Sequence, residues 1–320
     1  MARVNARGLA LMLVAMPTIA TAADFVHLEG GSFIMGSTEH YAEEGPRRAV
    51  TVGPFAIGRT EVTNAQFRTF VEATGYVTMA ERDRDPATHP HWPVDLLQAA
   101  SMVFAPPVAV ENLGDVTQWW RYRPGANWRQ PTGPGSSIAG LDDHPVVQVA
   151  PEDAAAYAAW AGGRLPTEAE WEFAARGGLE GSAAWDEPYD PVNGWKANTW
   201  QGVFPTVDDG ADGFHGTAPV ASFPANGYGL HDMTGNVWEM VADWWVPAHP
   251  EVAQVDPPGP TEELAARFAA PEVGALRVVK GGSWLCSPTF CARYRPSARQ
   301  PQEMGLGSNH IGFRIVRNEP

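Results

Sequence analysis

Glycine and proline interrupt this chain so often that long regular elements cannot dominate its fold. They supply 33 and 29 of its 320 residues, and both favour turns over the interiors of helices and strands. Tryptophan is also common, with 13 copies, and each large aromatic side chain can bury much apolar surface. The composition therefore predicts many turns and loops held by large aromatic side chains, with little regular secondary structure.

The length fits one large domain or two small ones and is ample for a sizeable buried core. No internal repeat, low-complexity tail or clear linker divides the sequence. We therefore expect a single α+β domain over residues 23–320.

The N-terminal residues have the pattern of a secretory signal peptide, predicted here to be residues 1–22. Arg3 and Arg7 precede a short apolar run at 9–16, and small residues at 20–22 form a cleavage site. This run is much shorter than the roughly 20 apolar residues that a membrane span needs. No other segment is long enough, so we expect an exported protein, periplasmic or secreted, without a membrane span.

The formal net charge of −15 restricts the partners of the chain. An acidic surface repels phosphate backbones and anionic lipids, so nucleic acid and bare membranes are poor partners. Such a surface suits weak capture of cations such as calcium.

Helices are predicted where capping residues flank apolar side chains at helical spacing. They span 63–75, 151–162 and 167–177, the last with a capping box and a C-terminal glycine. Trp160 and Trp171, on the second and third of these helices, are predicted to lie in the core.

Strands are expected in segments with apolar or alternating patterns. They are 31–36, a hairpin over 49–57 that turns at Gly53-Pro54, 144–149, 276–279 and 310–316. Residues 80–140 and 180–240 are predicted to be irregular, and 249–274 to be a surface excursion.

The chain contains only two cysteines, Cys286 and Cys291, with four residues between them. In an exported protein, a disulfide that closes a small loop is the simplest interpretation. Zinc sites usually need four ligands, and thioredoxin-like chemistry needs two intervening residues. Two thiolates without further ligands suit copper(I). Spacing alone leaves a structural disulfide and a copper(I) site open.

Other catalytic motifs are absent. There is no His-Glu-x-x-His, Gly-x-Ser-x-Gly, Walker loop or Gly-x-Gly-x-x-Gly sequence, so hydrolase and nucleotide-binding functions have no local support. His89 and His91 lack a third ligand nearby and are interpreted as part of a surface loop.

The sequence around the cysteines has a specific frame, Gly-Gly-Ser-x-x-Cys…Cys-x-Arg-Tyr-Arg. With other segments along the mature chain, it resembles the formylglycine-generating enzymes. The segments that carry the resemblance are 30–36, 127–129, 164–172, 216–220, 226–230, 235–239, 280–286, 291–295, 297–299 and 310–314.

The resemblance implies the formylglycine-generating variant of the C-type-lectin-like fold. It also implies that both cysteines bind copper(I) as thiolates. Ser283 and Trp238 would line the pocket for dioxygen and substrate, although packing in a tight turn is an alternative for both. The residues implied to contact substrate are Trp119, Trp120, Arg129, Arg295 and His310, whereas Trp128 is expected in the core.

The implied substrate is an unfolded sulfatase, or a peptide, with the sequence Cys-x-Pro-x-Arg. Its cysteine would be oxidised by dioxygen to formylglycine. A related oxidative tailoring enzyme that acts on a secreted peptide or metabolite is one alternative function. A non-catalytic lectin-like binding module with a Cys286–Cys291 disulfide is another. We expect a monomer.

The resemblance also implies two structural calcium sites in an acidic, glycine-rich region that would otherwise be interpreted as solvated loops. The first would use Asn198, Asp212 and the carbonyls of Thr199 and Phe214. The second would use Asp232, Glu239 and the carbonyls of Gly235 and Val237.

The chain also departs from its relatives. At the positions where eukaryotic relatives form disulfides it has Ala158, Ala175, Pro296 and Ile315. Ser287 and Phe290 replace a commoner His and Tyr in the cysteine loop, which puts the fit of the substrate in doubt.

Overall fold

The computed structural model describes residues 25–87, 90–180, 189–190, 192, 194–270 and 273–318. The predicted signal peptide and His89 therefore lie outside the described residues. Within the described ranges, no helix combines the length and apolar character that crossing a membrane requires.

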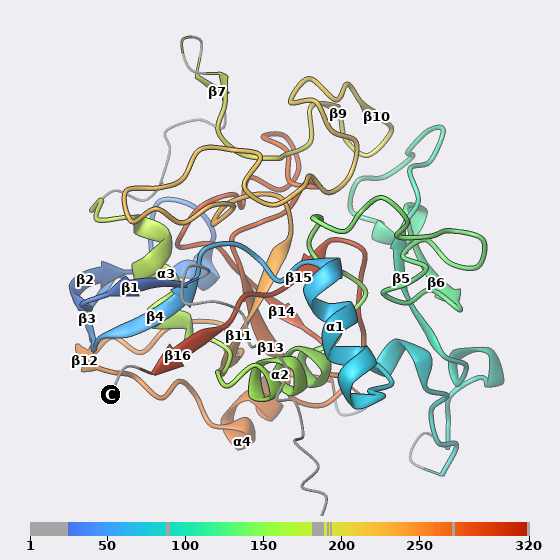
Figure 1. The fold of residues 1–320 in the computed structure, drawn as a ribbon, viewed down its shortest axis with the longest axis horizontal. Helices are drawn as coiled ribbons and strands as arrows, with labels where there is room; N and C mark the ends of the chain where they lie inside the picture. The colour runs from blue at the N-terminus through green and yellow to red at the C-terminus, as the bar shows by residue number, and fades with distance from the viewer. Residues whose placement is uncertain are drawn as a thin grey trace, which may run out of the picture.

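Regular elements are short, as the abundance of glycine and proline predicts (Figure 1). The helices are α1 (Asn64–Thr74), α2 (Pro151–Trp160), α3 (Glu168–Arg176) and α4 (Glu262–Ala265), with 3-10 turns at Ala42–Glu44, Met79–Glu81, Val94–Leu96, Val116–Gln118 and Ala266–Phe268. The strands are β1 (Phe25–Leu28), β2 (Gly31–Met35), β3 (Arg48–Val52), β4 (Phe55–Gly58), β5 (Ala100–Phe104), β6 (Trp120–Pro124), β7 (Tyr189–Asp190), β8 (Gly194–Trp195), β9 (Gly202–Val203), β10 (Val207–Asp208), β11 (Trp238–Trp244), β12 (Gln254–Val255), β13 (Arg277–Lys280), β14 (Arg299–Gln302), β15 (Ile311–Gly312) and β16 (Val316–Asn318).

The predicted helices are confirmed because their signals are local. The Thr63 and Thr167 side chains cap α1 and α3, and each helix ends at a glycine in the left-handed region. Trp171 is fully buried as predicted. Trp160 is only partly buried and packs against Phe70 on α1.

The predicted hairpin over 49–57 is wrong. Strands β1 and β2 run antiparallel to β4 and β3 in one continuous register, from Phe25 opposite Gly58 to Met35 opposite Arg48. The turn of this long hairpin is therefore the loop between β2 and β3, and Gly53-Pro54 lies at a break halfway along it. Proline cannot donate a ladder hydrogen bond, and the chain at Gly30 passes too close to the Val52 carbonyl for any side chain there.

Two further expectations fail because pairing partners are distant in sequence. Residues 80–140 contain a hairpin of β5 and β6, in which Ala100 pairs with Pro124 and Phe104 with Trp120. Residues 144–149 form no strand, only an isolated bridge from Pro145 to Thr63. Gln148 there has a φ of 61°, which is incompatible with an extended strand.

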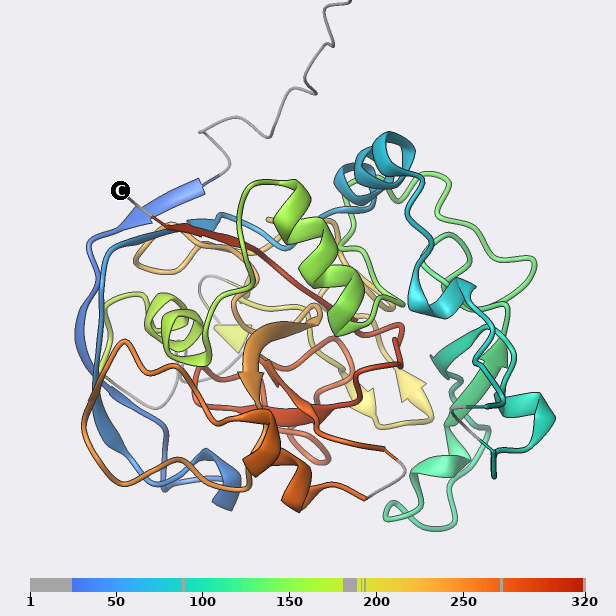
Figure 2. The ribbon, with the colours of Figure 1, turned by 90° about the horizontal axis from the view of Figure 1, so that it is seen from below.

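A four-stranded sheet in the order β14-β13-β11-β15 positions the cysteines. Helix α3 packs against β11 and β13, and the views in Figures 1 and 2 place this sheet centrally, with β1–β4 and the β5–β6 hairpin on opposite sides. The loop 281–298 joins the neighbouring antiparallel strands β13 and β14 and carries both cysteines. The predicted α+β class with little regular structure is confirmed.

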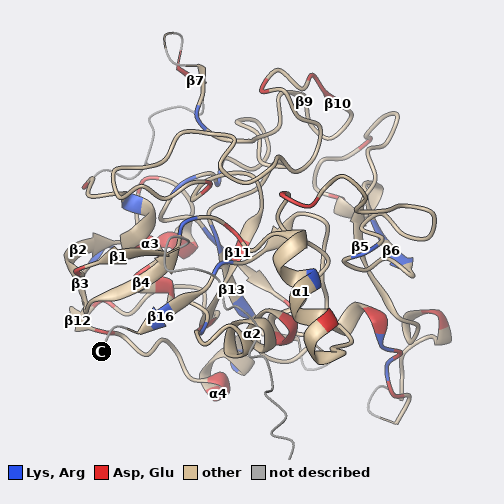
Figure 3. Ribbon diagram, in the orientation of Figure 1, with Lys and Arg blue, Asp and Glu red and all other residues tan. Residues whose placement is uncertain are grey.

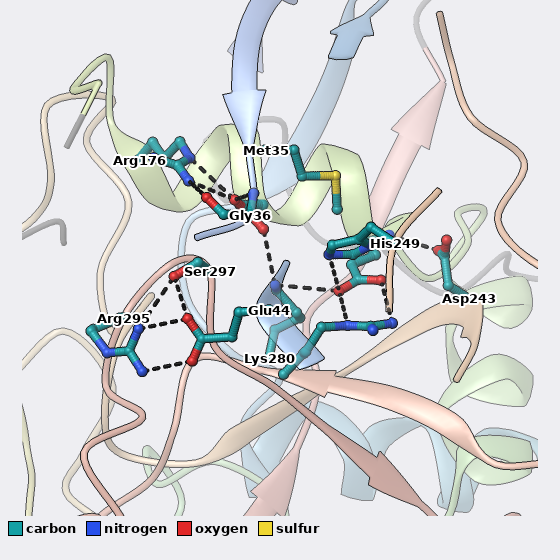
Figure 4. A network of polar contacts seen from close by, with 12 residues as sticks. Met35, Gly36, Glu44, Arg176, Asp243, His249, Lys280, Arg295 and Ser297 are labelled. Carbon is teal, nitrogen blue, oxygen red and sulfur yellow. Dashed lines mark hydrogen bonds and ion pairs between the residues drawn. The ribbon is translucent and has the colours of Figure 1, made fainter. Parts of the chain in front are cut away.

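Charged side chains are distributed over many helices and loops (Figure 3). Several are buried between α3 and the sheet (Figure 4). Glu168 accepts from Arg299 Nε at 2.7 Å and lies 3.4 Å from Lys280 Nζ. Glu172 pairs with Lys280 at 3.1 Å and with Arg176 at 2.7 Å. Because burial removes the hydration of these charged side chains, each of them depends on its ion-pair partners for stabilisation.

Asp243 lies beside this ion network and should make stability depend on pH. Burial, followed by the charge of Glu168, raises the pKa of Asp243 from 3.8 to about 7. A carboxyl with a raised pKa binds its proton more tightly in the folded state. Its contribution to stability is complete below the unfolded pKa and is lost as the pH rises through about 7.

We therefore expect Asp243→Asn to unfold like wild type near pH 4 but to be more stable above pH 7. The gain should be about 4 kcal/mol at pH 8. Urea unfolding at a series of pH values measures this difference, and Asp142→Asn, at an exposed pair with Arg68, is the control. Parallel curves for wild type and Asp243→Asn would contradict the assignment.

Candidate functional site

Both cysteines are free thiols in a tight loop. Their Sγ atoms lie 2.8 Å apart, farther than the roughly 2.05 Å of a disulfide bond. Gly282, with a φ of 76°, lets the chain double back, since a Cβ there would lie 2.8 Å from the Arg293 carbonyl oxygen. The Cys291 amide then donates to the Ser287 carbonyl at 3.0 Å. The loop thus holds the two sulfurs in contact.

The two thiols differ in their electrostatic surroundings. Burial, together with the hydrogen bond to Cys291, raises the pKa of Cys286 well above its usual range. The hydrogen bond from Cys286 lowers the pKa of Cys291, and the Arg293 guanidinium lowers it further. The pair therefore favours a state in which Cys286 stays a thiol and donates a hydrogen bond to a Cys291 thiolate.

Arg293 is a residue of the site for which the sequence predicted no role, although it lies within the cysteine frame. Its Nη2 donates to Glu43 at 2.5 Å, and its guanidinium lies 3.6 Å from the centre of the Tyr41 ring. Glu43 and Tyr41 belong to the loop between β2 and β3. That loop therefore positions the cation beside Cys291.

Arg295, predicted to contact substrate, has its guanidinium in a buried ion pair. It donates to both oxygens of Glu44 at 2.7 Å, and the Ser297 hydroxyl donates to Glu44 at 2.9 Å (Figure 4). The Glu44 carboxylate neutralises the Arg295 guanidinium. In the structure, this ion pair therefore holds the cysteine loop against the β2–β3 loop.

Ser283 and Trp238 lie on the buried side of the loop. The Cys286 amide donates to the Ser283 carbonyl at 2.9 Å, and the Ser283 hydroxyl accepts from the Leu285 amide at 3.2 Å. Trp238, on β11, is in the same apolar cluster as Cys286. Both side chains are almost fully buried, so they pack the loop in its present form.

Trp119, implied to contact substrate, is completely buried in the structure. Its ring packs edge-on against Phe290 at 5.6 Å and Phe204 at 5.8 Å, and those two rings stack at 4.3 Å. Phe290 immediately precedes Cys291, so this aromatic cluster packs against the cysteine loop. Removal of any one ring would leave a cavity beside Cys291.

Trp120 and His310 lie together, whereas Arg129 lies apart from them. The rings of Trp120 and His310 are 4.8 Å apart, and burial lowers the pKa of His310 to about 3, so it is neutral. Arg129 pairs with Glu81 and stacks on Trp128 at 4.3 Å. Trp128 itself is in the core, as predicted.

A pocket of about 400 Å³ adjoins the loop, and sequence reasoning did not find it. Trp200 and Trp284 are in its wall, and the Trp200 amide donates to the Cys286 carbonyl at 3.0 Å. Its size is typical of a site for a ligand or a few peptide residues. The lining comes from many segments, which explains why no local motif marks it: Asn64, Phe104, Pro106, Pro131, Thr132, Ile138, Leu141, Pro145, Val147, Trp200, Thr206, Asp208, His215, Gly216, Thr217, Trp284 and Asn309.

Two of the oxygens predicted for the first calcium site, from Asp212 and the Thr199 carbonyl, accept from one amide nitrogen. Gln201 Nε2 donates to Asp212 Oδ2 at 2.8 Å and also to the Thr199 carbonyl. The Phe214 amide donates to Asp212 Oδ1 at 3.0 Å. Asn198 Nδ2 donates to the Gly216 carbonyl at 2.9 Å. The loop therefore gathers oxygen acceptors around a positively polarised group.

The carboxylates predicted for the second calcium site are both buried. Both oxygens of Glu239 accept from Arg314 at 2.6 Å, and Oε2 also accepts from Trp171 Nε1 at 2.8 Å. Asp232 accepts from the Ala221 amide at 2.7 Å, and burial raises its pKa to about 6. The carbonyl residues Gly235 and Val237 lie between them in sequence, next to β11.

Glu61 is a third carboxylate here, and sequence reasoning missed it. Its Oε1 is buried and has no hydrogen-bond partner among the described residues. Burial, then the charges of Asp232 and Glu239, raise its pKa well above its usual range. These carboxylates outnumber the one arginine, Arg314, and a further cation would balance them. Over the described ranges, no three His, Cys, Asp or Glu side chains are grouped closely enough to hold a metal by themselves.

Comparison with known proteins places the chain in context. Residues 13–319 match the family model described as the sulfatase-modifying factor enzyme 1-like domain. The formylglycine-generating enzyme of Mycobacterium tuberculosis is 51% identical over 294 residues, which cover 92% of this chain and 97% of that protein. A mouse protein named inactive C-alpha-formylglycine-generating enzyme 2 is 41% identical over 304 residues, covering 91% and 84%. Relatives that share 41–51% of their residues with this chain therefore include proteins named as formylglycine-generating enzymes and a protein named as inactive.

A solved structure confirms the predicted C-type-lectin-like formylglycine-generating-enzyme fold. The chain matches the structure of PvdO from Pseudomonas aeruginosa with a TM-score of 0.59 and 27% identity, over 92% of this chain and 94% of that one.

Proposed function

Because the chain belongs to the sulfatase-modifying factor enzyme 1-like family, we propose that it oxidises a cysteine of a sulfatase to formylglycine. The observation that carries this proposal is the free cysteine pair, with sulfurs 2.8 Å apart and one thiol made acidic. The relatives named formylglycine-generating enzymes support the sulfatase as substrate.

We further propose copper(I) as the cofactor, with Cys286 and Cys291 as its ligands. The donor set fits, since soft thiolates select copper(I), and contact between the sulfurs brings both within reach of one ion. The ion would supply one-electron redox chemistry and activation of dioxygen. The hydrogen bond from Cys286, and then the Arg293 guanidinium, lower the pKa of Cys291, which favours the thiolate form that copper(I) binds.

The proposed oxidation needs a source of two further electrons. Conversion of the substrate CH₂–SH group to an aldehyde releases two electrons, whereas full reduction of dioxygen to the level of water takes four. We propose that two molecules of an external thiol supply the other two electrons. One substrate thiol, one dioxygen and two such thiols then give the aldehyde, hydrogen sulfide, one disulfide and one water.

The protein residues bind and shield the reacting cysteine in this proposal. Phe290, Trp119 and Phe204 would exclude water from the cysteine loop on which they pack. The pocket with Trp200 and Trp284 in its wall receives substrate residues. Trp120 and His310 remain predicted substrate contacts, as does Arg129.

Mass spectrometry of a Cys-x-Pro-x-Arg peptide tests the function. The peptide is incubated with copper-loaded protein, a thiol and air, and we expect conversion of its cysteine to the aldehyde, detectable with a hydrazine probe. A peptide with alanine for cysteine and an incubation without oxygen are the controls. Copper binding without aldehyde formation would favour a related oxidative enzyme, and absence of both a binding module.

We also propose calcium at both predicted sites, the second held by Asp232 and Glu239 together with backbone carbonyls. Calcium prefers six to eight oxygens and accepts mixed carboxylate and carbonyl ligands. Its charge would offset the burial that raises the pKa of Asp212 and of Asp232.

Chelation of calcium should lower the thermal midpoint by several degrees, since binding to the folded state alone stabilises it. Asp212→Ala should reduce the bound calcium from two ions to one, as measured by elemental analysis after dialysis. Asp209→Ala, an acidic neighbour outside both proposed sites, should keep two ions. Calcium content that is unchanged in Asp212→Ala would argue against the first site.

Export to the periplasm or beyond the cell, and a monomeric state, remain predictions.

A further inference from the structure

A second pocket, of about 430 Å³, shares no residue with the cysteine loop or with the pocket beside it. One side is formed mainly by the segment that follows β11, with the apolar side chains of Val246, Pro247, Pro250, Leu264 and Phe268. Leu264 and Phe268 remain 41% and 49% exposed, so this side is accessible from solvent. Its size and apolar lining are typical of sites for small organic molecules.

The polar part of the pocket lining includes an arginine without a counter-ion among the described residues. Arg48, on β3, is 7% exposed, and its Nε and Nη1 have no hydrogen-bond partner among the described residues. Its Nη2 donates only to the Met35 sulfur, a weak acceptor, at 3.4 Å. Burial lowers the pKa of Arg48, as expected of a charge that has lost its hydration. An unpaired buried cation is costly unless an anion accompanies it.

The acidic residues in the same wall are already engaged. Glu168 is paired with Arg299 and Lys280. Asp243 accepts from the Glu168 amide at 2.7 Å and, with its pKa near 7, carries its proton for much of the time at neutral pH. Neither carboxyl lies within ion-pair distance of Arg48 in the structure described.

A neutral histidine completes the polar side of the pocket. Burial lowers the pKa of His249 to about 3, and its Nε2 has no hydrogen-bond partner in the described structure. Figure 4 shows His249 and Asp243 next to the buried ion network. The pocket thus combines one unpaired positive charge and a spare imidazole nitrogen with an apolar wall.

We propose that this pocket binds a small organic monocarboxylate. Its carboxylate would lie toward Arg48 and His249, and its apolar body along Val246, Leu264 and Phe268. A single negative charge matches a single unpaired cation, whereas a dianion such as phosphate would leave one charge uncompensated near Glu168 and Asp243. This site is separate from the proposed oxidase chemistry and does not depend on it.

Calorimetry with hexanoate as the probe tests the proposal. We expect saturable binding with a dissociation constant of about 1 mM or lower, on the scale for a ligand of this size. Hexan-1-ol, hexylammonium and inorganic phosphate should each bind at least about tenfold more weakly, since each lacks the charge or the apolar body.

Arg48→Met should weaken hexanoate binding at least about tenfold while the thermal midpoint of the ligand-free protein stays the same or rises, because a buried unpaired charge is removed. Arg317→Met, which removes another partly buried arginine that lies over the Phe25 ring, is the control and should bind like wild type. Leu264→Glu adds a like charge at an exposed wall position and should also weaken binding, whether or not Arg48→Met folds.

Two results would overturn the proposal. One is the absence of saturable hexanoate binding by wild type up to about 10 mM. The other is wild-type affinity in Arg48→Met or in Leu264→Glu. Aldehyde formation on the sulfatase peptide is measured separately, so failure of either proposal leaves the other intact.

Discussion

Cys291→Ser is expected to abolish aldehyde formation while the domain stays folded. Serine replaces a soft, acidic thiol with a hydroxyl that stays protonated and binds copper(I) poorly. Turnover should fall on the order of 10³-fold or more, the scale found when one member of a unit that acts together is removed. The Cys291 side chain is only partly buried and nearly isosteric with serine, so the thermal midpoint should change little.

Cys286→Ser and the double variant should lose the same activity as Cys291→Ser, because residues that act as one unit are not additive. Ser287→Ala changes a buried hydroxyl in the same loop that contacts only Thr289 and should keep most of the turnover. Mass spectrometry measures the peptide conversion by each variant, and circular dichroism checks that each variant is folded. Substantial turnover by Cys291→Ser would remove the cysteine pair from the chemistry.

The parts of the fold that the sequence predicts are those with local causes. Helices α1 and α3 begin at a capping threonine and end at a glycine, and neither signal depends on distant residues. The long N-terminal hairpin was missed because Gly53-Pro54 imitates a turn, whereas the true turn lies between β2 and β3. Strand pairing is decided by partners far along the chain, which a local pattern cannot identify.

The same distinction applies to the site. The cysteine frame identifies Cys286 and Cys291, and the loop geometry brings their sulfurs together. The burial of Trp119 depends on Phe204 and Phe290, which reach it only in the folded chain. Arg48 and Glu61 have buried side-chain atoms without a hydrogen-bond partner among the described residues. A sequence motif cannot indicate this property.

Glu168→Gln is expected to cause the largest loss of stability of any single substitution considered. Glu168 is almost completely buried and compensates Arg299 and Lys280. Their charges hold its pKa well below the usual range, although burial opposes them. Glutamine keeps the shape but removes the charge, which leaves Arg299 without a carboxylate partner and Lys280 with Glu172 alone, next to unpaired Arg48. Removal of one partner from a buried ion pair costs about 3–5 kcal/mol.

Urea unfolding at pH 7 measures this loss, and Glu263→Gln is the matched control. Glu263 pairs with Arg267 on the surface, where such a pair contributes at most about 1 kcal/mol. Adding Arg299→Met to Glu168→Gln should recover part of the stability, because a cation that lost its carboxylate partner is replaced by an apolar side chain of similar length. If the double variant were instead less stable than the sum of its parts, the cost would lie in lost packing rather than in uncompensated charge. The ion network would then hold α3 against the sheet by shape.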